Sequence, residues 1–215
     1  EVGLGKTLEA GILISYMLRM KLVENVTILC PAGLLRQWQE EMDRHFKLDF
    51  WIYESGSKSF VSANSEHISS VSSNALSSAP KLKLVSAQWA RLNENEFKKL
   101  LPEMLIVDEA HAARVNVDQY GSKSTRLWKL LDSVKELIPH ILLLTATPMQ
   151  VHPSEYHGLL NLLRLPGQWK KFSKYEESLK IVSTQSNSIG LNEAKTMADL
   201  LLSTFESYSW LPELL

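Results

Sequence analysis

The chain has 215 residues, of which 45% are hydrophobic and 22% charged, a balance typical of a folded globular protein rather than a disordered tail or a fibrous rod. Its 23 basic and 24 acidic residues give a formal net charge of −1, so any nucleic-acid contact has to come from local patches. The single cysteine, Cys30, excludes an internal disulfide and a cysteine-cluster zinc site and favours a reducing, cytoplasmic compartment, and no apolar run reaches the roughly 18 residues that cross a bilayer, so we expect no membrane association.

Short apolar runs alternate with amphipathic patterns along the chain. Apolar residues at helical spacing predict helices over 8–20, 34–46, 125–137, 154–164 and 192–208. Short runs rich in β-branched and aromatic residues predict strands over 26–29, 50–53, 81–86, 105–107 and 141–144. This alternation predicts an α/β fold in which a mainly parallel sheet is covered by helices on both faces.

Residues 55–79 differ in composition from the rest of the chain. Eleven of these 25 residues are serine, and few large apolar residues accompany them. The composition predicts a long surface loop with at most a short helix.

The residues Gly3-Leu4-Gly5-Lys6-Thr7 directly precede the first predicted helix. Glycines allow backbone N–H groups to turn toward a phosphate, and the helix N-terminus adds positive potential. In such a loop the lysine reaches the β- and γ-phosphates, and the threonine hydroxyl binds Mg²⁺. The competing interpretation is a glycine-rich turn that happens to precede a helix.

A second acidic motif, Asp108-Glu109, follows the apolar run at 105–107. Hydrolysis of a phosphoanhydride needs a carboxylate that holds Mg²⁺ and a group that orients the attacking water. Asp108 suits the first role and Glu109 the second, although a surface acidic pair that caps the next helix is the alternative. Together with the glycine-rich loop, this motif predicts nucleotide hydrolysis.

Three motifs in chain order resemble the first RecA-like lobe of superfamily 2 helicases and translocases. They are Glu1-Val2-Gly3-Leu4-Gly5-Lys6-Thr7, Asp108-Glu109-Ala110-His111 and Thr145-Ala146-Thr147-Pro148. Glu1-Val2, the segment from Cys30 to Trp38 with Glu41, and Leu159 to Leu163 before Pro166 resemble the Swi/Snf-like branch. Val2 and Glu9-Ala10-Gly11 resemble the bacterial RapA-like members most, and the resemblance covers about residues 1–166.

The resemblance implies a RecA-like P-loop domain that uses ATP and Mg²⁺ and acts on double-stranded DNA, where it remodels DNA-bound protein complexes. It implies a cytoplasmic protein, associated with the nucleoid if the source is bacterial. The residues it assigns fall into three groups. The ATP site would contain Gly3, Leu4, Gly5, Lys6, Thr7, Asp108 and Glu109, with Thr7 and Asp108 on Mg²⁺. A second group, His111, Thr145 and Thr147, would couple nucleotide state to movement. A third group, Pro31, Gln37, Ser86 and Gln88, would face the nucleic acid.

The resemblance also predicts how the chain is organised. Residues 1–166 would form the ATP-binding lobe and residues 167–215 a helical extension toward a second RecA-like lobe. The strand that leads into the phosphate loop is expected before Glu1. Because the second lobe supplies arginines worth roughly 10³–10⁵ in rate in related systems, we expect almost no turnover from residues 1–215 alone.

Several alternatives stay open at this point. Ala146 stands where many eukaryotic Swi/Snf members carry Gly, and Ala is common in strand-separating helicases and in bacterial relatives, so a strand-separating DNA or RNA helicase competes with a translocase. A non-catalytic, nucleotide-gated DNA-binding module is the third reading. Trp38 lies on an apolar helical stripe, which predicts a core residue. The basic residues Arg164, Lys170, Lys171 and Lys174 favour a solvated face over a DNA-tracking patch.

Overall fold

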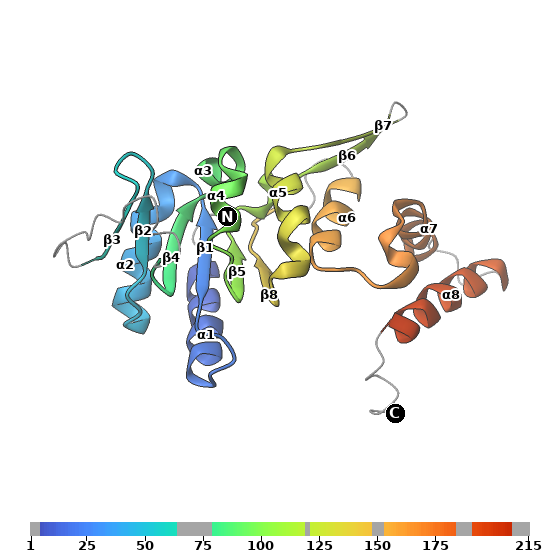
Figure 1. The fold of residues 1–215 in the computed structure, drawn as a ribbon. Helices are drawn as coiled ribbons and strands as arrows, with labels where there is room; N and C mark the ends of the chain where they lie inside the picture. The colour runs from blue at the N-terminus through green and yellow to red at the C-terminus, as the bar shows by residue number, and fades with distance from the viewer. Residues whose placement is uncertain (1–4, 64–78, 119–120, 148–152, 184–190, 208–215) are drawn as a thin grey trace.

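The computed structural model describes residues 5–63, 79–118, 121–147, 153–183 and 191–207 (Figure 1). Its centre is a six-stranded sheet in the order β3-β2-β4-β1-β5-β8, parallel except where β3 runs antiparallel to β2. In that order the strands are Ser59–Val61, Trp51–Glu54, Leu82–Ser86, Val26–Cys30, Met104–Val107 and His140–Leu143. The sheet confirms the predicted mainly parallel α/β architecture.

Helices cover both faces of the sheet. One face packs against α1 (Lys6–Arg19) and α2 (Leu35–Phe46), which share a core with alternate residues of the central strands. The other face packs against four helices. These are α3 (Ala87–Leu92), α4 (Glu94–Lys98), α5 (Arg126–Val134) and α6 (Pro153–Leu162).

The alternation of side chains along each strand explains the two cores. Ile28 of β1 and Ile106 of β5 lie in the core under α1 and α2, whereas their chain neighbours Leu29 and Leu105 lie in the core under α5. Successive strand residues point to opposite faces, so a strand buried on both sides reads as a continuous apolar run. This is why the runs at 26–29 and 105–107 identify central strands.

All five predicted strands and all five predicted helices are present, with the end of the 125–137 helix forming the 3₁₀ turn η4 (Lys135–Leu137). The predicted loop at 55–79 is wrong for residues 59–61, which form β3. Phe60 and Val61 are buried there, and β3 is held on the sheet by its pairing with β2 and by the buried Gln39 side chain, which donates a 3.1 Å hydrogen bond to the Val61 carbonyl. Residues 64–78 of that loop lie outside the described residues.

The sequence patterns did not predict the β6 (Val115–Asp118) and β7 (Gly121–Ser124) hairpin, which projects away from the sheet in Figure 1. Beyond α6 follow a 3₁₀ turn, η5 (Gly167–Lys170), and two helices, α7 (Phe172–Ser183) and α8 (Leu191–Ser207). No helix among the described residues is long and apolar enough to cross a membrane.

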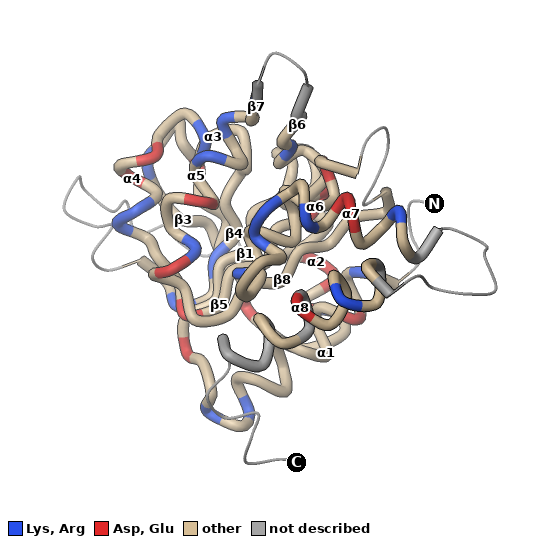
Figure 2. The backbone as a smooth tube through the Cα atoms, turned by 90° about the vertical axis from the view of Figure 1, so that its right-hand side faces the viewer, with Lys and Arg blue, Asp and Glu red and all other residues tan. Residues whose placement is uncertain are grey.

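Basic and acidic residues are interspersed along the chain (Figure 2). The basic residues that the sequence analysis grouped together, from Arg164 to Lys174, make different contacts. The Arg164 guanidinium donates to the backbone carbonyls of Lys135 and Ile138 and so ties the end of α6 to the end of α5. Lys174 forms an ion pair with Glu177 at 2.9 Å. Arg164 is therefore a structural residue of the domain.

Candidate functional site

The predicted site residues gather where the central parallel strands end. Cys30 ends β1, Ser86 ends β4, and Asp108 directly follows β5, with its backbone N–H bonded to the Leu29 carbonyl at 2.8 Å. Parallel strands end at one common edge of a sheet, which is the usual position of a ligand site in α/β folds. Two cavities open at this edge.

The first cavity begins at the N-terminus of α1. Gly5 precedes the helix with φ +84° and ψ 1°, a left-handed conformation that glycine adopts without a steric cost. The helix N-terminus leaves backbone N–H groups without helical acceptors, and the 14-residue helix adds positive potential there. This end of α1 is suited to an anion such as a phosphate. Gly3 and Leu4 lie outside the described residues.

The acidic motif forms a tight turn after β5. Glu109 has φ +51° and ψ 45°, a left-handed conformation that costs a residue with a side chain about 1 kcal/mol or more. The turn is held by the Glu109 N–H, which donates to Asp108 Oδ1 at 2.9 Å, and by the Ala110 N–H, which donates to the Leu144 carbonyl at 2.9 Å. Strain of this kind gathers at functional sites.

Side chains from all three motifs form one connected chain. Lys6 Nζ lies 3.4 Å from Glu109 Oε1, and His111 Nδ1 lies 3.1 Å from Glu109 Oε2. His111 Nδ1 also lies 3.3 Å from Thr145 Oγ1, which accepts a 3.1 Å hydrogen bond from the Thr147 N–H. The structure thus brings together residues that are up to 141 positions apart in the sequence, from Lys6 to Thr147.

Asp108 is 7% exposed and has a partner that the sequence did not indicate. The indole N–H of Trp38, itself 3% exposed, donates to Asp108 Oδ2 at 2.9 Å. The burial of Trp38 confirms its predicted place in the core. Cys30 is buried beside them, and both this burial and the nearby Asp108 charge raise the pKa of its thiol well above the usual range, so it stays protonated and unreactive.

The first cavity has a volume of about 320 Å³. It is lined by Gly5, Lys6, Thr7, Leu8, Leu34, Gln37, Trp38, Glu41, Arg44, His45, Asp108 and Glu109. Among the described residues, no group of three or more His, Cys, Asp or Glu side chains could hold a metal ion by itself. One hydroxyl and one or two carboxylates are instead the donor set with which Mg²⁺ is held when substrate phosphates supply its other ligands. The residues present therefore fit a Mg²⁺–nucleotide.

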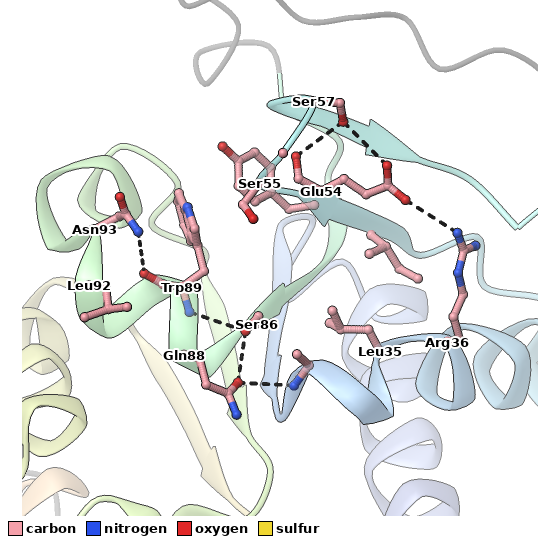
Figure 3. Close-up of a pocket in the computed structure, with 14 residues that line it drawn as sticks. Leu35, Arg36, Glu54, Ser55, Ser57, Ser86, Gln88, Trp89, Leu92 and Asn93 are labelled. Carbon is pink, nitrogen blue, oxygen red and sulfur yellow. Dashed lines mark hydrogen bonds and ion pairs between the residues drawn. The ribbon is translucent and has the colours of Figure 1, made fainter.

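The second cavity, about 700 Å³, lies between the start of α2, the end of β2 and helix α3 (Figure 3). Ser86 caps α3 by accepting from the Trp89 N–H at 3.3 Å, and Ser86 Oγ donates to Gln88 Oε1 at 3.0 Å. The Trp89 ring packs against Tyr53 with 4.5 Å between ring centroids. Amide and hydroxyl groups on a cavity wall are groups that contact phosphates and sugars.

The four residues predicted to face nucleic acid do not share one cavity. Ser86 and Gln88 line the second cavity, and Pro31 precedes Ala32, whose N–H donates to Gln88 Oε1 at 3.2 Å. Gln37 lines the first cavity instead, where its amide donates to Glu41 at 2.9 Å. Leu35 and Arg36 at the start of α2 line the second cavity, whereas Gln37, the next residue, lines the first. Helix α2 therefore borders both.

Known protein families and curated relatives are similar to most of this chain. The SNF2-related domain family matches residues 1–210 of the chain. The RNA polymerase-associated protein RapA of Actinobacillus pleuropneumoniae is 35% identical over 166 residues, which cover 76% of this chain and 17% of that protein. RapA of Erwinia tasmaniensis is 30% identical over 194 residues, which cover 89% of this chain and 19% of that protein. The chain spans less than a fifth of the length of these relatives.

Two solved structures share the fold. The SWI2/SNF2 ATPase core of Sulfolobus solfataricus in complex with double-stranded DNA superposes with a TM-score of 0.59 at 17% identity, over 94% of this chain and 38% of that chain. The same ATPase core domain solved separately gives a TM-score of 0.57 at 18% identity. The likeness shows that the sheet and its helices form the RecA-like fold that the motifs predicted.

Proposed function

Because this chain belongs to the SNF2-related domain family, we propose that it is the first, ATP-binding lobe of a motor that hydrolyses ATP to move along double-stranded DNA and to remodel proteins bound there. The movement would need a second lobe beyond these residues. A cytoplasmic protein, on nucleoid DNA if the source is bacterial, follows from this proposal.

The observation that carries the proposal is the chain of contacts from Lys6 through Glu109 and His111 to Thr145. It joins the phosphate loop, the acidic motif and the segment after β8 beside a cavity that fits a Mg²⁺–nucleotide. Degenerate, non-catalytic modules are expected to lose some of these groups, whereas all of them are present and in contact here.

The roles of the residues follow from their positions. Mg²⁺, when bound with ATP, would neutralise charge on the phosphates, and Thr7 and Asp108 would hold it. Lys6 would leave Glu109 and bind the β- and γ-phosphate oxygens, since a long, partly exposed ion pair at 3.4 Å is readily exchanged. Glu109 would then be free to orient a water molecule and accept its proton. His111 would report this change to Thr145 through their contact.

The second cavity is the side we assign to DNA. Ser86 and Gln88 lie on its wall beside Trp89, and α2 connects it to the nucleotide side. One supporting relative is named for its association with RNA polymerase, and one structural neighbour was solved with double-stranded DNA. A protein complex on duplex DNA is therefore the partner we propose.

The proposal is tested by steady-state ATP hydrolysis of the full-length protein without nucleic acid and with duplex DNA, single-stranded DNA or RNA. We expect strong stimulation by duplex DNA, and a loss of about 100-fold or more in Lys6→Ala, because that variant lacks a preorganised cation at the phosphates. Stimulation by single strands or RNA alone would favour a strand-separating helicase. Absence of hydrolysis under every condition would favour a nucleotide-gated binding module.

A further inference from the structure

Both carboxylate oxygens of Asp108 accept a hydrogen bond from a neutral donor. Oδ2 accepts from the Trp38 indole at 2.9 Å and Oδ1 from the Glu109 N–H at 2.9 Å. Two donors on the two oxygens fix the plane of the carboxylate and leave its remaining lone pairs available. The orientation of Asp108 is therefore set by one backbone group and one side chain.

No salt bridge joins Asp108 to a lysine, arginine or histidine in the described part of the chain, and Lys6 is paired with Glu109 instead. Asp108 is thus a buried anion that is stabilised by dipoles but not neutralised. A buried, unneutralised carboxylate on a cavity wall is suited to bind a cation.

The packing of Trp38 does not by itself require this hydrogen bond. Its ring lies in the core with Met42, Ile28 and Cys30, and a phenyl ring would fill much of the same space. The indole N–H is aimed at the one carboxylate that the proposed mechanism assigns to Mg²⁺. Partners that orient a metal-binding side chain commonly contribute 10- to 100-fold to metal affinity or activity.

We propose that Trp38 is a positioning residue, whose indole N–H holds the Asp108 carboxylate in the orientation that binds the Mg²⁺ of the nucleotide complex. This inference rests on the proposed ATPase function. It predicts that removal of the N–H weakens the use of Mg²⁺ specifically, while the nucleotide itself still binds through α1 and Lys6.

The test compares Trp38→Phe with the wild type in the full-length protein. A fluorescent ADP analogue is titrated in EDTA and at a series of Mg²⁺ concentrations, and ATP hydrolysis is measured over the same series. We expect the half-saturating Mg²⁺ concentration to rise about tenfold or more in both measurements. The Kd of the analogue in EDTA should change less than about twofold, since no phosphate contact is lost.

Trp128→Phe is the matched control. The Trp128 indole also donates a 2.9 Å hydrogen bond, but its acceptor is the Gly158 carbonyl, in the core on the opposite face of the sheet. This variant loses a bond of the same kind and length that does not involve the Asp108 carboxylate. Its half-saturating Mg²⁺ concentration should equal that of the wild type.

Where Trp38→Phe lowers the melting temperature too far, incorporation of β-(3-benzothienyl)alanine at position 38 keeps the bicyclic shape and removes only the N–H. An unchanged Mg²⁺ dependence in a folded variant would overturn the positioning role and leave the ATPase proposal intact. A wild type that binds no nucleotide, or a Lys6→Ala variant that binds as well as the wild type, would overturn both.

Discussion

Lys83 lies on β4 and Lys81 directly precedes that strand, and one side chain is buried while the other is exposed. Lys81 is exposed, and its ion pair with Glu24 raises its pKa. Lys83 is 1% exposed, and its ammonium donates to Asn25 Oδ1 and to the Pro80 carbonyl. Burial lowers the pKa of Lys83 to about 8, since no carboxylate among the described residues forms an ion pair with it.

The titration of Lys83 predicts a pH-dependent stability. Between pH 8 and its ordinary pKa of 10.5, the unfolded chain binds more protons at this site than the folded protein, so stability rises with pH. The wild type should gain about 2 kcal/mol relative to Lys83→Met between pH 7 and pH 10, as measured by urea unfolding. The contribution of Cys30 titration to stability cancels in this comparison, because the wild type and Lys83→Met both carry Cys30.

Lys81→Met serves as the control for that comparison. The pKa of Lys81 is raised from its ordinary value and lies above the range tested. The difference in unfolding free energy between Lys81→Met and the wild type should therefore stay constant from pH 7 to pH 10. Parallel pH profiles for Lys83→Met and the wild type would show that the Lys83 ammonium keeps its ordinary pKa in the folded protein.

Sequence motifs identified some residues of the site but not others. Lys6, Asp108 and Glu109 were identified from their motifs, because phosphate chemistry fixes both the residue types and their neighbours in the sequence. The bond between Trp38 and Asp108 was not, since it joins residues 70 positions apart and depends on how α2 is rotated against the sheet. Periodicity predicts that Trp38 is buried, but it does not predict which way the indole N–H points.

At the scale of elements, helices α1 and α2 approach closely on their shared face of the sheet. Gly11 in the middle of α1 allows this, because a Cβ built there would lie 2.0 Å from the Phe46 ring at the end of α2. Both helices contribute walls to the first cavity. A glycine that weakens an isolated helix therefore sets the separation of the two helices around the site.

Gly11→Ala should lower the free energy of unfolding by about 1–2 kcal/mol, because an overpacking cost of about 2–3 kcal/mol exceeds the intrinsic helix gain of about 1 kcal/mol. The measurement is chemical unfolding of Gly11→Ala, Phe46→Ala and the double variant. In the Phe46→Ala background the same substitution should be neutral or stabilising. A stabilising effect of Gly11→Ala in the wild type would contradict the close packing.

The elements found from the sequence are those with strong local signals. The strands at 26–30 and 104–107 are buried on both faces, and α2 and α5 carry clear apolar stripes. Strand β3 was missed because Phe60 and Val61 stand alone among serines and are held by Gln39, more than 20 positions away. Its position is fixed by tertiary contacts, which local patterns do not contain.

At the scale of the whole molecule, two cavities open at one edge of a single sheet, and α2 borders both. On one side, the Gln88 side chain accepts a hydrogen bond from the Ala32 N–H, just before α2 begins. On the other side, Trp38 in the first turn of α2 donates to Asp108. A shift of α2 caused by a bound DNA backbone would therefore act directly on the carboxylate that we assign to Mg²⁺. In the function that we propose, this arrangement would couple DNA contact to ATP hydrolysis.

The central claim, ATP-driven movement along intact duplex DNA, is tested most directly by triplex displacement with the full-length protein. A third strand bound to one end of a labelled duplex is released when a translocase moves through it, whereas separation of the duplex releases a different labelled strand. We predict ATP-dependent release of the third strand with the duplex intact, and no release by Lys6→Ala. Separation of the duplex strands, or release of the third strand without ATP, would contradict the account.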